Sequence, residues 1–278
     1  MPIKKGINLL YEEGMAVKER FIRCALLFGL CLTGCKHLKG DEFSHYKTRY
    51  ELNNYTFAVK DSQGERVGPR LNVFSDDEDV VFQNKEGIHL QLIEKNNQFL
   101  AAEIISIDAK GLGRYEFVLE GDIDQIPAEV IVSPFLYADD ENEVDIEFSS
   151  WNEEDNADES PWLKEGNYQF VVQPYYKRGN SNRPTEKLDL NRGEKGGMTR
   201  YRIDNFADKV RIEIYDMGNS NHKPLATWEY PHGVAKGDEM RFRLNIYLRD
   251  EEAIQSKGLS EPISIILRDF KFTKLKDL

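Results

Sequence analysis

Cysteine is scarce in this chain of 278 residues: its three cysteines, Cys24, Cys31 and Cys35, all lie near the N-terminus. The rest of the chain has no thiol for a disulfide, a cysteine-ligated zinc site or a cysteine nucleophile. Runs of about 20 apolar residues, which a membrane-spanning helix needs, are also lacking. The sequence therefore predicts a domain that is stabilised by its core, with no transmembrane helix.

Positive charge is also in short supply. The formal net charge is −12, which argues against nucleic acid or an anionic membrane surface as the main partner. The five histidines, at positions 37, 45, 89, 222 and 232, have no metal-ligand spacing, so we predict no metal site from them. Hydrophobic residues make up 40% of the chain and charged residues 31%, a balance typical of a globular protein.

Amphipathic helical periodicity is nearly absent, and only residues 251–256 predict a short helix. The rest is a series of strand-like runs separated by glycine-containing turns. These runs are residues 55–59, 79–82, 88–93, 101–107, 114–119, 130–138, 143–148, 168–173, 200–204, 210–215, 225–230, 240–248 and 263–272. About a dozen strands without alternating helices predict an all-β fold, an antiparallel β-sandwich or jelly roll.

The N-terminal segment has the pattern of an export signal. Lys18, Arg20 and Arg23 precede an apolar run at residues 25–32, which leads into Leu32-Thr33-Gly34-Cys35. This resembles the lipobox of bacterial lipoproteins, which implies a signal peptide over residues 1–35, a true start at Met15 and lipidation of Cys35. We expect residues 36–48 to form a tether and residues 49–278 the domain, anchored by lipid to a membrane of the bacterial cell envelope. The alternative is an ordinary buried helix with a chance cysteine.

The most informative stretch is Glu143-Val144-Asp145-Ile146-Glu147-Phe148. Successive side chains of a strand point to opposite faces, so this strand would bury Val, Ile and Phe and align three acids on its other face. Glu143 and Glu147 would have Cα atoms ~13 Å apart, close enough for their long side chains to lean together. Retaining glycosidases need two carboxyl groups about 5–5.5 Å apart. The spacing alone fits either such a site or a solvent-facing acidic strand.

The pattern Glu143-x-Asp145-x-Glu147 resembles the E-x-D-x-E signature of glycoside hydrolase family 16, the concanavalin A-like jelly-roll endoglucanases. The resemblance extends along the chain in the family's order. It includes Gly113-Arg114-Tyr115-Glu116-Phe117, Phe135-Leu136-Tyr137, Phe148-Ser149-Ser150-Trp151, Gln169-Phe170-Val171-Val172-Gln173-Pro174 and Arg243-Leu244-Asn245-Ile246-Tyr247. The resemblance implies that Glu143 is the nucleophile, Glu147 the general acid/base and Asp145 the helper between them.

Strand alternation adds candidate substrate-binding residues. Sugar chains bind to clefts in which aromatic rings stack on pyranose faces and polar groups fix the hydroxyls. The candidates are Glu116, Phe135, Tyr137, Trp151, Gln169, Gln173, Asn245 and Tyr247. Core packing is the alternative for each aromatic residue, and Trp151 is the preferred stacking residue because it directly follows the acidic strand. Tyr247 stands where many family members have tryptophan.

These observations lead us to expect an endo-acting retaining β-glycanase, with a lean toward mixed-linkage β-1,3-1,4-glucan. Its partners would be a polysaccharide and, through Cys35, a membrane, and we expect a monomer. No cofactor is predicted. Some relatives bind calcium through an aspartate of the closing strand, where Asp269 stands, but no partner ligands can be identified. Two alternatives stay open: a non-catalytic carbohydrate-binding or structural surface lipoprotein, and a glucan transglycosylase.

Overall fold

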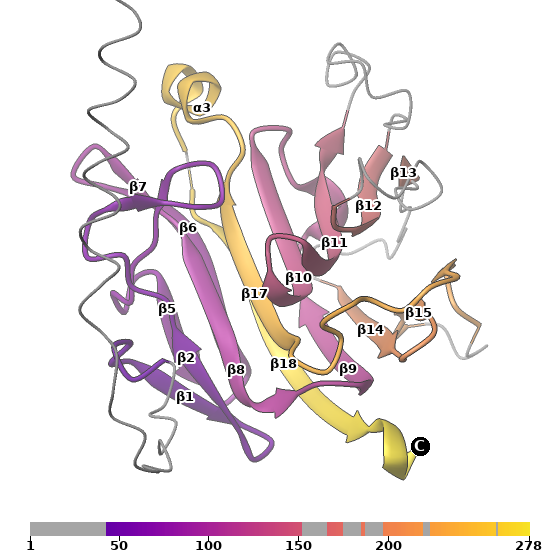
Figure 1. Cartoon of the computed structure of the whole chain (residues 1–278). Coiled ribbons are helices and arrows are strands. Elements are labelled where there is room, and N and C mark those ends of the chain that lie inside the picture. Colours follow the sequence, from indigo (N-terminus) through magenta and orange to yellow (C-terminus); the bar gives the residue numbers. More distant parts are fainter. Residues whose placement is uncertain (1–42, 152–165, 175–184, 187–196, 219–222, 260) are drawn as a thin grey trace, which may run out of the picture. The chain divides into compact units, whose positions relative to one another are not determined.

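A computed structural model describes residues 43–151, 166–174, 185–186, 197–218, 223–259 and 261–278 (Figure 1). The chain divides into two compact units, Met1–Glu42 and Phe43–Leu278, and every described residue belongs to the second. The predicted signal peptide and Cys35 lie outside the described residues. The second unit begins earlier than the expected domain start at residue 49, because Phe43 is buried against Ala58 and Ile105.

The first sheet contains eight strands in the order β1-β2-β8-β17-β10-β11-β12-β13, and each strand pairs antiparallel with its neighbours. Neighbours in this sheet are distant in sequence, as with β8 beside β17 and β17 beside β10 (Figure 1). The strands are β1 (Arg49–Leu52), β2 (Tyr55–Val59), β8 (Ala102–Lys110), β17 (Arg241–Leu248), β10 (Val130–Asp139), β11 (Asn142–Trp151), β12 (Gly166–Val172) and β13 (Thr185–Glu186).

The second sheet has the order β16-β15-β14-β9-β18-β6-β5. A further strand, β7, also pairs with β6. Its strands are β16 (Ala226–Tyr230), β15 (Val210–Asp216), β14 (Met198–Asn205), β9 (Gly113–Glu120), β18 (Ile263–Lys274), β6 (Gly87–Lys95), β5 (Val81–Asn84) and β7 (Gln98–Leu100). The two-residue strands β3 (Arg66–Val67) and β4 (Asn72–Val73) form a separate small ladder. The predicted all-β sandwich is therefore confirmed, and the expected strands are present within a few residues of their bounds.

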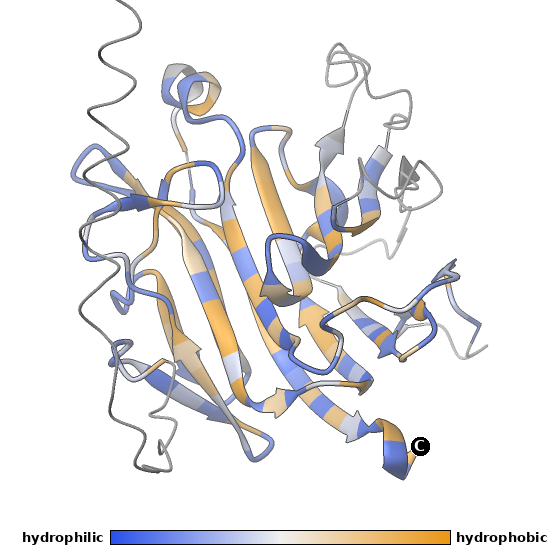
Figure 2. Cartoon of the chain, in the orientation of Figure 1, coloured by the Kyte–Doolittle hydropathy of each residue, from blue (hydrophilic) through white to orange (hydrophobic). Residues whose placement is uncertain are grey.

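The core lies between the two sheets and follows from strand alternation. Apolar and polar residues alternate along β18, visible as bands of orange and blue (Figure 2). Phe242 of the first sheet meets Phe117 and Phe270 of the second, with ring centroids 4.8 Å apart in both contacts. Burying such rings supplies much of the hydrophobic stabilisation that holds two sheets together.

Two glycines let β18 insert between β9 and β6. Gly113 has φ +155°, and a Cβ there would lie 2.3 Å from the carbonyl oxygen of Thr273. Gly87 has φ +144°, and its Cβ would lie 2.2 Å from the carbonyl oxygen of Leu267. A side chain at either position would push β18 away, so glycine is needed for the close approach.

The predicted short helix is present as α3 (Glu251–Lys257). The side chain of Asp250 accepts a hydrogen bond from the backbone N–H of Ala253 at 2.9 Å, which satisfies one of the helix's free donors. Gly258, with φ +71°, ends the helix and donates its N–H to the carbonyl oxygen of Ile254. Two 3₁₀ turns, η1 (Ile123–Gln125) and η4 (Leu275–Asp277), complete the described helical elements. In the described ranges, no helix is long and apolar enough to cross a membrane.

Candidate active site

The three acids lie on one face of β11, as the alternation predicts. Val144, Ile146 and Phe148 are fully buried in the core, while Glu143, Asp145 and Glu147 line a cavity of about 280 Å³ on the outer face of the first sheet. The acids are therefore neither core residues nor members of a freely exposed strand.

Strand pairing builds the floor of this cavity in rows that cross the strands. Asp145 pairs with Phe135 on β10, which pairs with Arg243 on β17. The pairs Val132–Phe148 and Phe135–Asp145 bring Ser133 opposite Glu147. Side chains in one row lie about one strand spacing apart, ~4.8 Å, so each acid has a polar or aromatic neighbour across the cleft.

Hydrogen bonds from Gln169 and Gln173 hold both ends of the acidic row. Gln169 is buried on β12 opposite Glu147 and donates from Nε2 to the Glu147 carboxylate. Gln173 donates its backbone N–H to the carbonyl oxygen of Glu143 at 3.0 Å. Both glutamines thus border the acids, Gln169 through its side chain and Gln173 through its backbone.

The electrostatics of the row favour a shared proton. Burial raises the pKa of Glu143 to about 7, and the charges of Glu147 and Glu103 act in the same direction. A hydrogen bond with Asp145 and the charge of Arg243 oppose this rise. Two interacting carboxyl groups titrate as a pair, so near neutral pH the cleft can hold both a protonated and an ionised carboxyl group.

Four of the predicted substrate-binding residues line the cavity with the acids: Phe135, Tyr137, Asn245 and Tyr247. Burial raises the pKa of Tyr247 well above its ordinary value, and the carboxylates of Glu147, Asp145 and Glu143 raise it further. The Tyr247 hydroxyl therefore keeps its proton at neutral pH and can donate a hydrogen bond. In the described part of the chain, the buried Oδ1 atom of Asn245 has no hydrogen-bond partner, which leaves it able to accept one from a ligand. The backbone of Trp151 ends β11, but its side chain lies outside the described residues.

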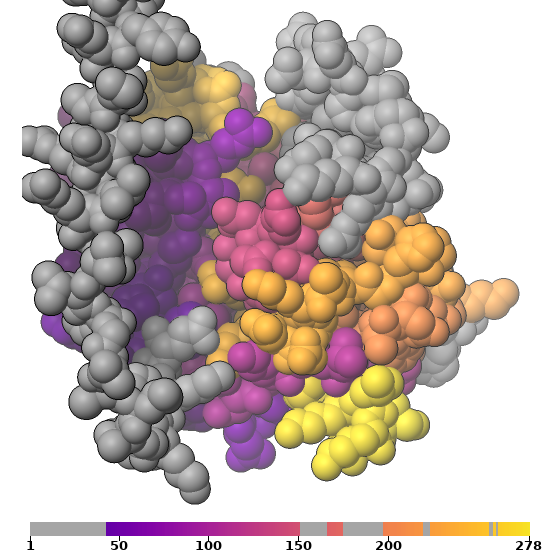
Figure 3. Space-filling view, in the orientation of Figure 1, coloured from indigo at the N-terminus to yellow at the C-terminus, as the bar shows by residue number. Residues whose placement is uncertain are grey.

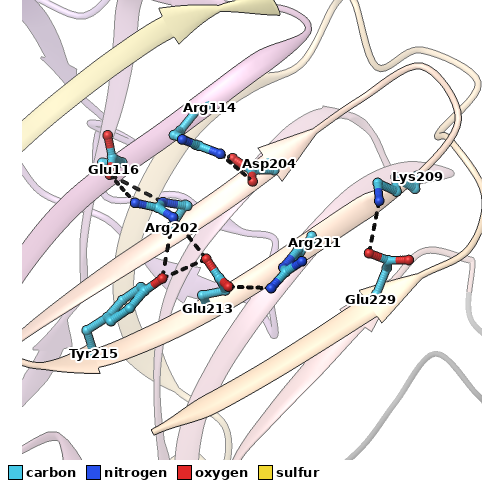
Figure 4. Close-up of polar contacts among 9 residues, drawn as sticks. All are labelled: Arg114, Glu116, Arg202, Asp204, Lys209, Arg211, Glu213, Tyr215 and Glu229. Carbon is cyan, nitrogen blue, oxygen red and sulfur yellow. Dashed lines mark hydrogen bonds and ion pairs between the residues drawn. The ribbon is translucent and has the colours of Figure 1, made fainter. Parts of the chain in front are cut away.

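The prediction that Glu116 faces the cleft is wrong. Glu116 belongs to β9 in the second sheet, between the core residues Tyr115 and Phe117, and so points outward on the other side of the sandwich. There it accepts a hydrogen bond from Arg202 Nη2 at 3.0 Å (Figure 4). Alternation identified the correct face of the strand but could not tell which sheet the strand joins.

Glu116 is one member of a charged network on that outer face. Arg202 also binds Glu213 at 3.0 Å, and Glu213 accepts hydrogen bonds from Arg211 at 2.6 Å and from the Tyr215 hydroxyl at 2.7 Å (Figure 4). Opposite charges alternate across β9, β14 and β15, which stabilises the pairing register of these strands.

Sequence reasoning missed a charged group at the far end of the cavity. Glu103 on β8 is 1% exposed and binds both Lys60 Nζ at 2.8 Å and Arg243 Nη1 at 3.1 Å. All three residues line the cavity. Glu103 directly precedes the core residue Ile104, so strand alternation points Glu103 to the outer face, and Arg243 shares a face with Asn245. The sequence pattern therefore marked both residues as outward-facing. Their meeting depends on β8 lying beside β17, which local pattern does not reveal.

The rim of the cavity is stabilised by the turn between β10 and β11. Tyr137 donates its hydroxyl hydrogen to Asp140 at 2.7 Å, and the Arg243 guanidinium lies 4.3 Å from the centre of the Tyr137 ring. Lys236 forms a 2.6 Å ion pair with Asp139, the last residue of β10 before this turn. In the space-filling view, the pink surface of the turn adjoins the orange surface of the segment before β17 (Figure 3).

Metal-ligating groups do not gather in the described residues: no cluster of three or more His, Cys, Asp or Glu side chains could hold an ion there. Asp269, at the position considered for calcium, accepts a hydrogen bond from Asn53 Nδ2. The acidic segment 152–159 lies outside the described residues.

No protein-family model and no curated protein matches the sequence, whereas solved structures match the fold. A β-glucanase of Bacillus licheniformis has a TM-score of 0.55 and 14% identity, over 81% of this chain and 94% of that one. A glycosyl hydrolase family protein of Mycobacterium fortuitum also has a TM-score of 0.55 and 14% identity, over 78% and 91%. An immunostimulatory antigen and pseudo β-1,3-glucanase of Mycobacterium tuberculosis has a TM-score of 0.51 and 15% identity, over 76% and 88%.

These likenesses establish the β-glucanase type of jelly roll as the fold of this chain. Identities of 14% show the fold alone. The chemical interpretation therefore depends on the acidic row and its surroundings.

Proposed function

We propose that this protein is a retaining glycoside hydrolase that cleaves a β-glucan-type polysaccharide. The supporting observation is the row Glu143, Asp145 and Glu147 on the floor of a cavity that is also lined by Phe135 and Tyr247. A binding protein gains nothing from three mutually repelling carboxyl groups, since their repulsion lowers stability. A retaining hydrolase needs two of them in different protonation states.

The proposed reaction uses the pair in turn. Glu147 protonates the oxygen of the leaving sugar while the Glu143 carboxylate attacks the anomeric carbon, which forms a glycosyl-enzyme and releases the first product. Glu147, now ionised, takes a proton from water, and the resulting hydroxide displaces Glu143 from the sugar. The Glu143 carboxylate is free again and Glu147 is again protonated, so the cycle closes.

The shared proton must lie on Glu147 when the reaction starts. The hydrogen bond of Asp145 to Glu143 and the charge of Arg243 both stabilise the ionised form of Glu143. These two groups limit the rise of the Glu143 pKa to about 7, so above pH 7 the Glu143 carboxyl group is ionised and can act as the nucleophile. Gln169 keeps the Glu147 side chain oriented through its hydrogen bond.

A reducing-sugar assay of the full chain on lichenan, laminarin, xyloglucan and agarose tests the proposal. Glu143→Ala and Glu147→Gln should abolish activity on whichever polymer is cleaved, and Glu116→Gln, the same type of change on the opposite sheet, should retain it. Proton NMR of the first product should detect the β anomer, as retention requires. Absence of cleavage of every polymer, or activity unchanged in both site variants, would overturn the assignment. Because we expect a mixed-linkage β-1,3-1,4-glucan as the substrate, lichenan, which has these linkages, should be the preferred polymer.

Two other functions compete for the same cleft. The M. tuberculosis neighbour is called a pseudo β-1,3-glucanase, so a glycan-binding protein without hydrolysis is one alternative. It predicts glycan binding with no product. A transglycosylase is the other, and it predicts products longer than the starting oligosaccharide when acceptor sugars are in excess.

The lipobox-like Leu32-Thr33-Gly34-Cys35 supports a second proposal, that the chain is exported and anchored by lipid at Cys35 in the bacterial cell envelope. Mass spectrometry of the membrane-extracted protein should find an N-terminal cysteine carrying acyl chains. An N-terminus without lipid at Cys35 would contradict the anchor.

A further inference from the structure

The chain itself covers part of the sheet face that bears the acids. Phe43 to Tyr46 form a tight turn, closed by a hydrogen bond from the N–H of Tyr46 to the carbonyl oxygen of Phe43 at 3.0 Å. The Phe43 side chain is 5% exposed and packs against Ala58 of β2 and Ile105 of β8. Because the adjoining residues Phe57, Val59 and Ile104 belong to the core, Ala58 and Ile105 point to the outer face, as the acids do.

Cations from neighbouring strands fasten the turn in place. The Arg241 guanidinium lies 5.3 Å from the centre of the Phe43 ring, and Arg49 donates from Nη2 to the Phe43 carbonyl oxygen at 3.2 Å. The Tyr46 ring stacks beside the Phe43 ring, with centroids 6.3 Å apart. The turn is thus packed and bonded rather than loosely laid on the surface.

Tyr46 stands at the border of the cavity. Its ring packs against the cluster of Phe43, Ala58 and Ile105, and Ile105 pairs with Arg243 of β17. Glu103 and Arg243 line the cavity. The turn is therefore the immediate neighbour of the cavity on its β8 side.

The Lys60–Glu103 pair closes the rest of this side. Lys60 donates from Nζ to Glu103 and also to the carbonyl oxygen of Gly68 at 2.9 Å, while it lies 3.9 Å from the centre of the Phe74 ring. Gly68 and Pro69 also line the cavity. A sugar chain that runs across the strands from β11 toward β8 thus meets a barrier of paired charges and aromatic rings.

Strand spacing sets the room before this barrier. The row from Ile105 under Phe43 to Asp145 passes through Arg243 and Phe135, which makes three strand steps, or ~14 Å. A β-linked glucose unit is roughly 5 Å long by its covalent geometry, close to the strand spacing of ~4.8 Å. The space between the acids and the barrier therefore holds about three sugar units.

We propose that Phe43 and Tyr46 form a wall that ends the cleft at its β8 side and limits the substrate there to about three sugar units. This inference rests on the proposed function, since it assumes that a glycan lies across β11. It replaces the expected endo action with end-directed action: one end of the glycan abuts the wall, and a short product of bounded length leaves from that side. An endo-acting enzyme would need a cleft open on both sides of the acids.

The test uses the full chain and end-labelled β-glucan oligosaccharides of increasing length. The wild-type protein should release from one chain end products of no more than about three units from the first turnover. The variant Phe43→Ala/Tyr46→Ala should release longer products as well. Tyr46→Ala alone keeps the contacts of Phe43 with Ala58 and Ile105 and should shift the product lengths in the same direction, which guards against a folding defect. Ser44→Ala, a change at an exposed position of the same turn, should leave the product lengths unchanged.

A binding measurement separates this inference from the proposed function. Calorimetric titration of the same oligosaccharides should find that wild-type affinity stops rising once the sugar chain fills the space before the wall. The double variant should bind the next longer oligosaccharides roughly threefold or more tightly than wild type does. If the double variant binds longer oligosaccharides more tightly but no polymer is cleaved, the wall is supported and the hydrolase proposal fails. Hydrolysis with identical product lengths in wild type and both wall variants would overturn the wall alone. Failure to bind or cleave any oligosaccharide would overturn both.

Discussion

Replacing Glu143 by glutamine should stabilise the folded protein at alkaline pH, because the buried carboxyl group resists ionisation. Its pKa is raised to about 7 from the ordinary value of 4.5. Between these two values the folded state binds the proton more tightly than the unfolded state does. The stability that the protonated group contributes is therefore complete below about pH 4.5 and is lost as the pH rises through 7.

The magnitude follows from the shift. One pKa unit corresponds to about 1.4 kcal/mol, so the full shift would cost the folded state roughly 3 kcal/mol above pH 7. The cleft is open to water, which screens the charge, and we reduce the expected cost to about 1–2 kcal/mol. Glutamine keeps the shape and can still hydrogen-bond Asp145, but it does not ionise, so Glu143→Gln removes this cost.

Thermal unfolding at two pH values measures the effect. At pH 5 the variant and wild type should melt at nearly the same temperature, whereas at pH 8.5 the variant should melt about 2–8 °C higher, given 2–4 °C per kcal/mol in a domain of this size. Glu116→Gln serves as the control and should destabilise at both pH values, because its carboxylate pairs with Arg202. A melting difference for Glu143→Gln that does not grow with pH would refute the reasoning.

Three further predictions follow from the site and the fold. Arg243→Met removes a charge that lowers the pKa of Glu143, so the acidic limb of the pH profile of kcat/KM should move up by roughly half to one pH unit; an unmoved limb would mean that this limb does not report Glu143. Phe148→Ala empties a fully buried site behind the acids and should reduce the free energy of unfolding by about 3–5 kcal/mol in a denaturant titration; a loss below 1 kcal/mol would show that the site is not packed. Arg202→Met leaves two carboxylates without their shared partner and should cost about 1–2 kcal/mol in the same titration, with kcat/KM unchanged; an altered kcat/KM would imply coupling between the two outer faces.

The local sequence pattern was sufficient to predict most of the strands and which face of each strand is buried. Alternation in β11 predicted that Val144, Ile146 and Phe148 are buried and that the acids face the other way, and the structure has this arrangement. The period of two is a property of any strand, so it can be read without knowing the partners. Five short strands were missed, since two to four residues are too few to display a clear period: β1, β3, β4, β7 and β13.

Strand partners could not be read in the same way. Glu116 was placed in the cleft because its strand has a clear outer face, yet that strand belongs to the second sheet. Glu103 and Arg243 were overlooked as site residues, although each lies on a correctly predicted strand. In both cases the missing information was which distant strands pair.

The sequence by itself determined that this chain forms a sandwich of strands and that one strand presents three carboxyl groups on a single face, since both depend on short-range alternation. Only the tertiary structure decided what surrounds those carboxyl groups. Pairing of β8 with β17 and of β17 with β10 brings Glu103 and Arg243 into the cleft, and packing of Phe43 on β2 and β8 sets where the cleft ends. These contacts join residues far apart in the chain, and their geometry depends on how two whole sheets pair and pack.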